Sequence, residues 1–157
     1  MNSDTTSMNG GSFRPTYETN YNRSKEDEVS DRLRRLWEME IEKLKPYFPA
    51  DVAVISNDST VVAFCEIKCR TNDMTAYPTY MVSVHKLYEL ASLASFTEIP
   101  SLLVVEWSDC LGYWKVPETL KGIETGIGGT KKRGDPQDME PVAYIPIGDF
   151  KILEKQE

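Results

Sequence analysis

The chain has 157 residues, about the length of one ordinary domain, and its 40% hydrophobic and 27% charged residues exclude wholesale disorder and a coiled coil. The net charge of -7 argues against a long basic face that binds a polyanion, but not against a site where a divalent cation supplies the positive charge. The sequence has neither a long apolar run nor a secretory leader, so we expect a cytoplasmic protein with no membrane contact. Its three cysteines match no disulfide or zinc framework, and we interpret them as reduced core residues.

The N-terminal part of the chain divides into a polar tail and a helix. Residues 1–22 carry few aliphatic side chains, which predicts a mobile tail before a single domain at 23–157. From Ser24 to Lys45, apolar residues recur at spacings of three and four, which is typical of an amphipathic helix. They are Val29, Leu33, Leu36, Trp37, Ile41 and Leu44. Ser24 is the expected N-cap, and Pro46 is expected to end the helix.

Two strands are predicted next. Residues Val52–Ile55 form a short apolar run that indicates a buried strand, with Asp51 at its start. The turn residues Asn57–Ser59 separate this run from Thr60–Arg70, which is β-branched and strongly alternating. We therefore expect the two strands to form a hairpin.

The second half of the chain predicts a helix and further strands. Ser83 is the expected N-cap of an apolar-faced helix, and Ser101–Trp107 and Leu111–Val116 have the pattern of strands. Residues 119–140 are rich in glycine and predict a flexible basic loop, and Val142–Ile147 predicts a final strand. Strands and helices of these lengths favour one mixed α/β sheet flanked by helices.

Charged side chains interrupt one face of the second strand. Period-two alternation places only apolar residues on one face of Thr60–Arg70, whereas the other face presents Glu66, Lys68 and Arg70 in sequence. Such charges inside a sheet need partners, and a metal ion with a phosphate would supply them. Asp51 opens the neighbouring strand and can approach Glu66 across the ladder, although the register is left open.

These residue types suit one kind of chemistry. Two carboxylates repel each other unless a cation lies between them, and oxygen ligands favour magnesium or manganese over zinc. Lys68 lies two residues after Glu66 and therefore points to the same side of the strand, where it can handle a proton or position a water. The arrangement suits metal-assisted attack of water on a phosphodiester.

The sequence resembles the PD-(D/E)XK nuclease superfamily, which includes restriction endonucleases, Holliday-junction resolvases and phage exonucleases. The resemblance rests on Pro49-Ala50-Asp51 and, fifteen residues later, Glu66-Ile67-Lys68, with a helix before and a helix after, and it covers about residues 24–108. It implies a restriction-endonuclease-like α/β core with the order α-β-β-β-α-β around a central mixed sheet. Ala50 departs from the strict motif but leaves the essential carboxylate.

The resemblance also implies roles for single residues. Asp51 and Glu66 would bind Mg2+ or Mn2+, helped by the Ile67 carbonyl, and Lys68 would orient the nucleophilic water. Many members add an acid from the first helix. We assign that role to Glu26, which lies on the apolar stripe, with Glu28 in reserve because it lies far around the helix.

Several basic or polar residues are candidates for contact with the substrate. Lys86, three residues after the capping Ser83, matches the polar position that many members have on the second helix. Arg70, Tyr80 and the loop residues Lys131, Lys132 and Arg133 could add phosphate contacts.

Each candidate also has an ordinary structural interpretation. Glu66 with Lys68 could be a surface pair, Asp51 a turn residue, and Glu26 a first-turn acid that interacts with the helix dipole. Glu40 falls on the apolar stripe and indicates either a hydrogen-bonded core acid or a change in helix phase. His85 is the only histidine, which excludes histidine triads and two-histidine zinc sites, and we place it on a helix surface.

Two other patterns favour structure over chemistry. Gly126–Lys132 lacks the order of residues of a phosphate-binding loop, so it is expected to be a flexible loop. Trp107, Tyr113 and Trp114 lie in strand patterns, where core packing or a subunit contact is commoner than base stacking.

The expected function is a magnesium-dependent deoxyribonuclease that recognises DNA ends, branches or structure more than sequence. Compact size and acidity suit a phage or mobile-element protein, which would act in the host cytoplasm. Cleavage of a double strand or a junction would require two protomers, and Trp107–Trp114 is the candidate interface of such a homodimer; the sequence does not decide the oligomeric state. The alternative from another class is a non-catalytic module on a nuclease fold that binds nucleic acid or protein, and phosphoryl transfer to a nucleotide ranks last.

Overall fold

The computed structural model describes residues 20–129 and 139–156, in which one α-helix precedes the strands and a second divides them into two groups. The longer elements are α1 (Asn20–Trp37), β1 (Glu40–Lys43), β2 (Val52–Ile55), β3 (Val61–Cys69), β4 (Thr79–Ser83), α2 (Val84–Thr97), β5 (Ser101–Glu106), β6 (Cys110–Lys115), β7 (Glu124–Gly129), β8 (Met139–Pro146) and β9 (Lys151–Lys155). Two short 3-10 helices, η1 (Met74–Ala76) and η3 (Ile147–Asp149), lie before β4 and before β9.

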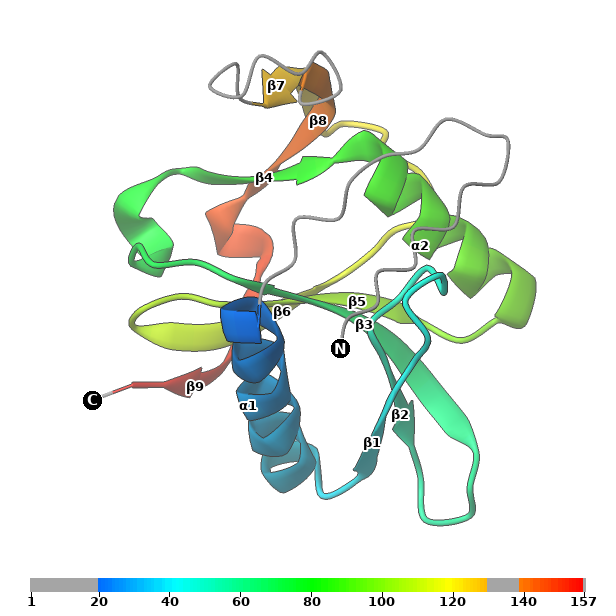
Figure 1. The fold of residues 1–157 in the computed structure, drawn as a ribbon. Helices are drawn as coiled ribbons and strands as arrows, with labels where there is room; N and C mark the ends of the chain where they lie inside the picture. The colour runs from blue at the N-terminus through cyan, green and yellow to red at the C-terminus, as the bar shows by residue number, and fades with distance from the viewer. Residues whose placement is uncertain (1–19, 130–138, 157) are drawn as a thin grey trace, which may run out of the picture.

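The central sheet has the strand order β1-β2-β3-β5-β6-β9. Strands β3 and β5 are parallel and are connected through β4 and α2, whereas the other neighbouring strands are antiparallel. Helices α1 and α2 lie at different sides of this sheet (Figure 1). The expected α/β class, with a central mixed sheet and the core order α-β-β-β-α-β, is therefore confirmed.

A second, smaller sheet was not expected. It has the order β4-β8-β7 and is antiparallel throughout. Strand β7 lies within residues 119–140, for which a loop was predicted. A Cβ on Gly128 would lie 2.9 Å from Val142 Cγ2, so at this position the absence of a side chain allows close packing. Residues 130–138, which include Lys131, Lys132 and Arg133, lie outside the described part of the chain.

The first helix is displaced from its predicted bounds. It begins at Asn20, so Ser24 lies inside the helix and is not its N-cap, and residues 20–22 belong to the helix and not to a tail. It ends at Trp37 because Glu38 adopts a left-handed φ of 52°. The next residues form β1, in which Ile41 is buried and Glu40 is exposed, so the apolar spacing of three and four continued by coincidence across a helix and a strand.

The hairpin and the second helix form as predicted. Strands β2 and β3 pair in antiparallel fashion. Ser83 caps α2, and its hydroxyl oxygen accepts a hydrogen bond from the Lys86 N–H at 3.3 Å. Val142–Ile147 largely coincides with β8, which is followed by β9 and so is not the last strand.

The alternation along β3 divides the core between the two faces of the sheet. Ala63, Cys65 and Ile67 pack in a cluster under α1, whereas Phe64 packs in the cluster on the side of α2 and the second sheet. Cys65 and Cys110 are buried free thiols, as expected for reduced core residues, and Cys69 is partly buried and also free.

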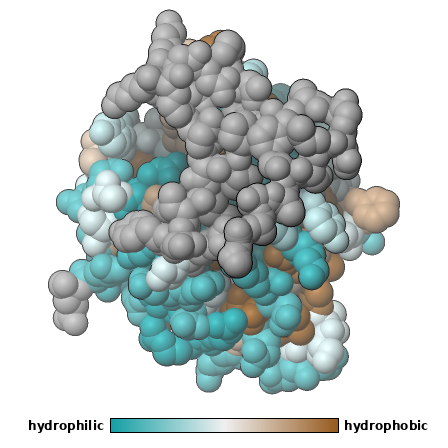
Figure 2. Space-filling model, viewed as in Figure 1, coloured by the Kyte–Doolittle hydropathy of each residue, from teal (hydrophilic) through white to brown (hydrophobic). Residues whose placement is uncertain are grey.

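The tryptophans after β5 and in β6 do not form the exposed face that a subunit contact requires. Trp107 and Trp114 are buried within this chain, so the predicted interface at Trp107–Trp114 is wrong for both tryptophans. Figure 2 shows mainly hydrophilic residues over α1, with a smaller hydrophobic patch beside it where β1 and β2 lie in Figure 1. Across residues 20–129 and 139–156, helices are too short or too polar to span a membrane.

Candidate active site

Asp51 and Glu66 meet where the β2–β3 hairpin opens. In that antiparallel ladder Val52 pairs with Cys65, so the next position along the register brings Asp51 opposite Glu66. The Asp51 N–H donates to the Cys65 carbonyl at 2.9 Å, and Asp51 Oδ2 accepts from the Ile67 N–H at 2.8 Å. The register that the sequence left open therefore brings the two carboxylates together.

Glu66 is a buried acid in an unfavourable position. Its side chain lies on the β3 face that packs toward α2, and the residue is 4% exposed. Burial raises the pKa of its carboxyl, and repulsion from Asp51 raises it further, while Lys68 and Lys86 oppose both effects. A divalent cation would relieve both the desolvation and the repulsion.

Two lysines reach this carboxylate from different elements. Lys68 Nζ lies 3.4 Å from Glu66 Oε2, and Lys86 Nζ lies 3.6 Å from Glu66 Oε1. Lys86 also donates to the Pro49 carbonyl at 3.0 Å, which ties the start of α2 to the segment before Asp51. Burial tends to lower the pKa of Lys86, but Glu66 and Glu89 outweigh it and hold that pKa above its ordinary value. Lys86 is therefore cationic at neutral pH.

Glu26 of α1 approaches the same region from the other side. Glu26 and Asp51 both line a pocket of about 370 Å3 between α1 and the β1–β2 connection. Glu28 points elsewhere, because its carboxylate pairs with Lys25 Nζ at 3.5 Å and its side chain is largely exposed. The structure thus places Glu26, and not Glu28, beside the motif.

The donor atoms at this place suit a hard divalent cation. Asp51 and Glu66 offer carboxylate oxygens, and the Ile67 carbonyl points toward the Asp51 side, because the N–H and C=O of one strand residue face the same neighbour. Mg2+ is commonly held by one or two carboxylates and keeps several waters. Within residues 20–129 and 139–156, no group of three or more His, Cys, Asp or Glu side chains is arranged to hold a metal ion.

The predicted substrate residues take different positions. Arg70 directly follows β3, is exposed, and has its guanidinium carbon 4.8 Å from the centre of the Tyr80 ring. The Tyr80 ring packs against Trp107 and Phe150, and burial raises the pKa of its hydroxyl to about 12. That hydroxyl is buried and has no hydrogen-bond partner among the described residues, so Tyr80 belongs to the wall of a pocket and not to an exposed phosphate-binding surface. His85 lies exposed on α2, as expected.

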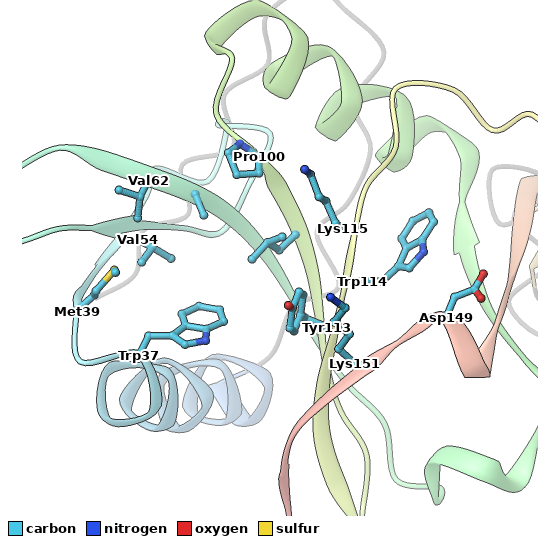
Figure 3. Close-up of a pocket in the computed structure, with 12 residues that line it drawn as sticks. Trp37, Met39, Val54, Val62, Pro100, Tyr113, Trp114, Lys115, Asp149 and Lys151 are labelled. Carbon is cyan, nitrogen blue, oxygen red and sulfur yellow. The ribbon is translucent and has the colours of Figure 1, made fainter.

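A larger pocket, of about 530 Å3, lies away from these carboxylates. It opens at the first residues of β3 and β5, where Trp37 and Tyr113 pack edge to face with ring centres 6.4 Å apart. Figure 3 shows Trp37 at the end of α1 beside Met39, and Lys151 next to Tyr113. Its mostly apolar lining contains neither Asp51 nor Glu66, so this pocket is separate from the candidate site.

Sequence reasoning missed one buried charged cluster. Glu106 ends β5 and is 6% exposed, and it contacts Arg32 at 2.6 Å and Lys25 at 3.3 Å. The sequence did contain a signal for this cluster, because Glu106 is an acid at the end of an otherwise apolar strand. Because Lys25 precedes Glu26, this cluster fixes the turn of α1 that carries the candidate metal ligand.

Comparison with solved structures finds a similar chain in the Holliday junction resolvase Hjc of Archaeoglobus fulgidus, an archaeal hyperthermophile. The two are 16% identical, the TM-score is 0.46, and the match covers 74% of this chain and 85% of the resolvase. Comparison with curated proteins finds no match.

A family profile described as "Phage putative PDDEXK endonuclease" matches residues 12–153, which is most of the chain. This range contains the acids of the hairpin, both lysines and both helices described above. The chain therefore belongs to the phage putative PDDEXK endonuclease family.

Proposed function

We propose that this protein is a magnesium- or manganese-dependent deoxyribonuclease that hydrolyses phosphodiester bonds at the Asp51–Glu66 pair. The observation that carries the proposal is the state of Glu66, which is buried opposite a second carboxylate with lysine ammonium groups no closer than 3.4 Å. Family membership supports an endonuclease. Ends, branches or altered structure in DNA are the proposed targets, because the acidic chain lacks the charge for a long basic face.

The residues of the site have separate tasks in this reaction. Asp51, Glu66 and the Ile67 carbonyl would hold the cation, and Glu26 would contribute a further oxygen directly or through water. The bound cation would polarise the phosphate and lower the pKa of a water molecule. Lys68 is 41% exposed at its side chain and can donate a hydrogen bond to the attacking water or to a phosphate oxygen.

Lys86 acts mainly on the other groups of the site. Its ammonium lowers the pKa of Glu66 and donates to the Pro49 carbonyl, so it favours the ionised acid and holds the segment that carries Asp51. In the overall step, water forms a bond to phosphorus, the bond from phosphorus to the leaving oxygen breaks, and that oxygen receives a proton. The products are a phosphate monoester and a free hydroxyl.

Cleavage of labelled DNA tests the proposal. Linear, nicked and four-way-junction substrates are incubated with Mg2+ or Mn2+, and the wild type is compared with Glu66→Ala and Lys68→Ala. We expect metal-dependent cutting that is lost in both variants, with the preferred substrate identifying the class of target. His85→Ala is the matched control on α2, because its side chain lies exposed beside Lys86 without touching Glu66.

An inactive wild type that also binds no metal in calorimetry would overturn the proposal. The protein would then be a binding module on a nuclease fold, and its affinity for DNA or a protein partner would be insensitive to a chelator. Sedimentation of the protein with and without junction DNA tests a homodimer, which we propose for cleavage of two strands. A location in the host cytoplasm is part of the same proposal.

A further inference from the structure

A second pocket lies beyond the catalytic end of β3. Its volume is about 400 Å3, and it is formed between the segment after β3, the second sheet and η3. Trp107 and Tyr80 form buried parts of its wall, whereas Tyr77 is 63% exposed. Aromatic rings therefore line this pocket both at depth and near solvent.

Arg70 is the one charged side chain among the described residues that line this pocket. Arg70 and Asn72 line it, and none of its lining residues is an aspartate or a glutamate, although the chain as a whole is acidic. Arg70 donates to the neighbouring Cys69 carbonyl at 3.1 Å and lies over the Tyr80 ring, and it forms no ion pair with a carboxylate in the part of the chain that the structure describes. Its charge is thus available to an anion at the mouth of the pocket.

One buried polar atom in this wall has no partner within the protein. Tyr80 is 4% exposed, and its hydroxyl finds no hydrogen-bond partner among the described residues. This hydroxyl has essentially no accessible surface, so Tyr80 contributes its ring and not its hydroxyl to the pocket wall.

The pocket and the proposed catalytic site share a strand. Arg70 lies on the same side of the chain as Glu66 and Lys68, and its N–H still donates to Glu106 at 2.8 Å, so the extended geometry continues past Cys69. Successive strand residues rise about 3.3 Å, which places the backbone of Arg70 about 13 Å from that of Glu66. A nucleic-acid strand cut at Glu66 can therefore present a phosphate close to the cut to Arg70 and a base to the pocket.

We propose that this pocket accepts one unstacked nucleobase of the DNA strand beside the cleaved phosphodiester, with its phosphate at Arg70. The inference rests on the proposed nuclease function and deepens it. A base inside a regular duplex is stacked on both sides, so only an unpaired or extruded nucleotide can enter. Stacking on a tyrosine such as Tyr77 tolerates any base, because every base has a π-face. The pocket would thus favour branched, gapped or frayed DNA over an intact duplex.

Binding of a fluorescent base tests this pocket without cleavage. The probe is a duplex with one unpaired 2-aminopurine, titrated with protein in Ca2+ so that cutting is suppressed, and the same duplex with the 2-aminopurine paired is its control. We expect quenching of the unpaired base by the wild type and a roughly 10-fold weaker binding by Tyr77→Ala, in line with the loss of one stacking contact. Tyr88→Ala is the matched control, because Tyr88 is also an exposed tyrosine but lies on α2 outside the pocket.

Tyr80→Phe is a control inside the pocket, because it keeps the ring and removes only a hydroxyl that the pocket does not expose. Its melting temperature should equal or exceed that of the wild type, and its affinity for the unpaired base should be unchanged. Unchanged affinity in Tyr77→Ala would overturn the base pocket, even if the wild type cuts DNA. Conversely, a Tyr77-dependent quench in a protein that never cuts would support the pocket and refute the nuclease.

Discussion

Two glutamates are buried on opposite faces of the central sheet, and each lies between two basic side chains. Glu66 faces the α2 side with Lys68 and Lys86, whereas Glu106 faces α1 with Lys25 and Arg32. Their exposed fractions are 4% and 6%. Burial and the number of neighbouring cations therefore do not distinguish them.

The distances and the kind of cation do distinguish them. Arg32 reaches Glu106 at 2.6 Å and Glu154 at 2.8 Å, which are charge-assisted hydrogen bonds from one planar guanidinium. The nearer lysine nitrogen, Lys68 Nζ, lies 3.4 Å from the Glu66 carboxylate, longer than the arginine contacts of Glu106, and Asp51 repels the charge of Glu66. The short arginine pair is that of a structural ion pair, whereas a carboxylate held loosely by lysines beside a second acid supports the cation site that we propose at Glu66.

Replacing Glu66 should give the largest effect on catalysis and little loss of stability. We expect Glu66→Gln to lower the cleavage rate at least about 1000-fold, or about 4 kcal/mol in the barrier, because a cation ligand is lost. Its free energy of unfolding in a chelator should equal or exceed that of the wild type, because the variant buries a neutral glutamine in place of a charged carboxylate. Initial rates and urea denaturation measure the two quantities, and a variant that cuts within tenfold of the wild type would contradict the assignment.

Replacing Glu106 should give the opposite result. We expect Glu106→Ala to lower the free energy of unfolding by about 3 kcal/mol, because Arg32 then stays buried without its principal partner. Urea denaturation measures the change. Glu154→Ala serves as the control with a smaller effect, since that carboxylate is more exposed. A loss of stability below about 1 kcal/mol for Glu106→Ala would contradict the structural role of Glu106 and its contrast with Glu66.

The first helix offers a smaller test. Glu26→Gln should weaken Mg2+ binding about 10-fold or more, as expected when a carboxylate near a metal is removed. Glu28→Gln changes the charge equally two residues away and should leave the affinity unchanged, because its carboxylate faces Lys25 and solvent. Isothermal calorimetry measures both affinities, and equal values for the two variants would remove Glu26 from the site.

The smallest effect concerns the pH dependence of stability in the absence of metal. The folded-state pKa of Glu66 lies above the ordinary value of glutamate, so the folded chain binds this proton more tightly than the unfolded chain. That stabilisation is complete below the ordinary value and is lost as the pH rises through the folded-state pKa. The free energy of unfolding of Glu66→Gln, relative to the wild type, should therefore increase as the pH rises over this window in a chelator.

Adding Mg2+ at pH 7 is the control for this pH series. The cation binds the folded wild type and should reverse the order, so that the wild type becomes the more stable protein. Thermal melts at each pH with and without Mg2+ measure the difference. A pH-independent difference between wild type and Glu66→Gln would show that Glu66 is ionised as easily as in the unfolded chain.

The elements that the sequence predicted correctly are determined by residues that lie close together in the chain. The turn Asn57–Ser59 joins β2 to β3, and Ser83 begins α2 through a bond to a residue three positions later. Local patterns contain that information. The bounds of α1 were wrong because an apolar spacing of three and four continued through Glu38, whose left-handed conformation depends on the packing of β1 against β2.

The candidate site was predicted in its residues but not in its geometry. Asp51, Glu66 and Lys68 were selected from residue type and alternation, whereas the pairing of Val52 with Cys65 that brings the acids together is a tertiary fact. The second sheet was missed because its strands β4 and β8 are distant in the chain. In addition, the glycines of β7 predict a loop, since the sequence does not show the residues that pack closely against them.

The same distances along the chain bear on the order of folding. Val52 and Cys65 lie 13 positions apart, whereas Ser83 pairs with Val142, 59 positions later. Closing the longer loop costs more chain entropy, so we expect the hairpin to form before the second sheet. The carboxylates would then meet early, and the aromatic pocket beside Arg70 would be completed late and lost first in mild denaturant. Selectivity for the shape of the DNA would fail in such a state before the ability to bind metal does.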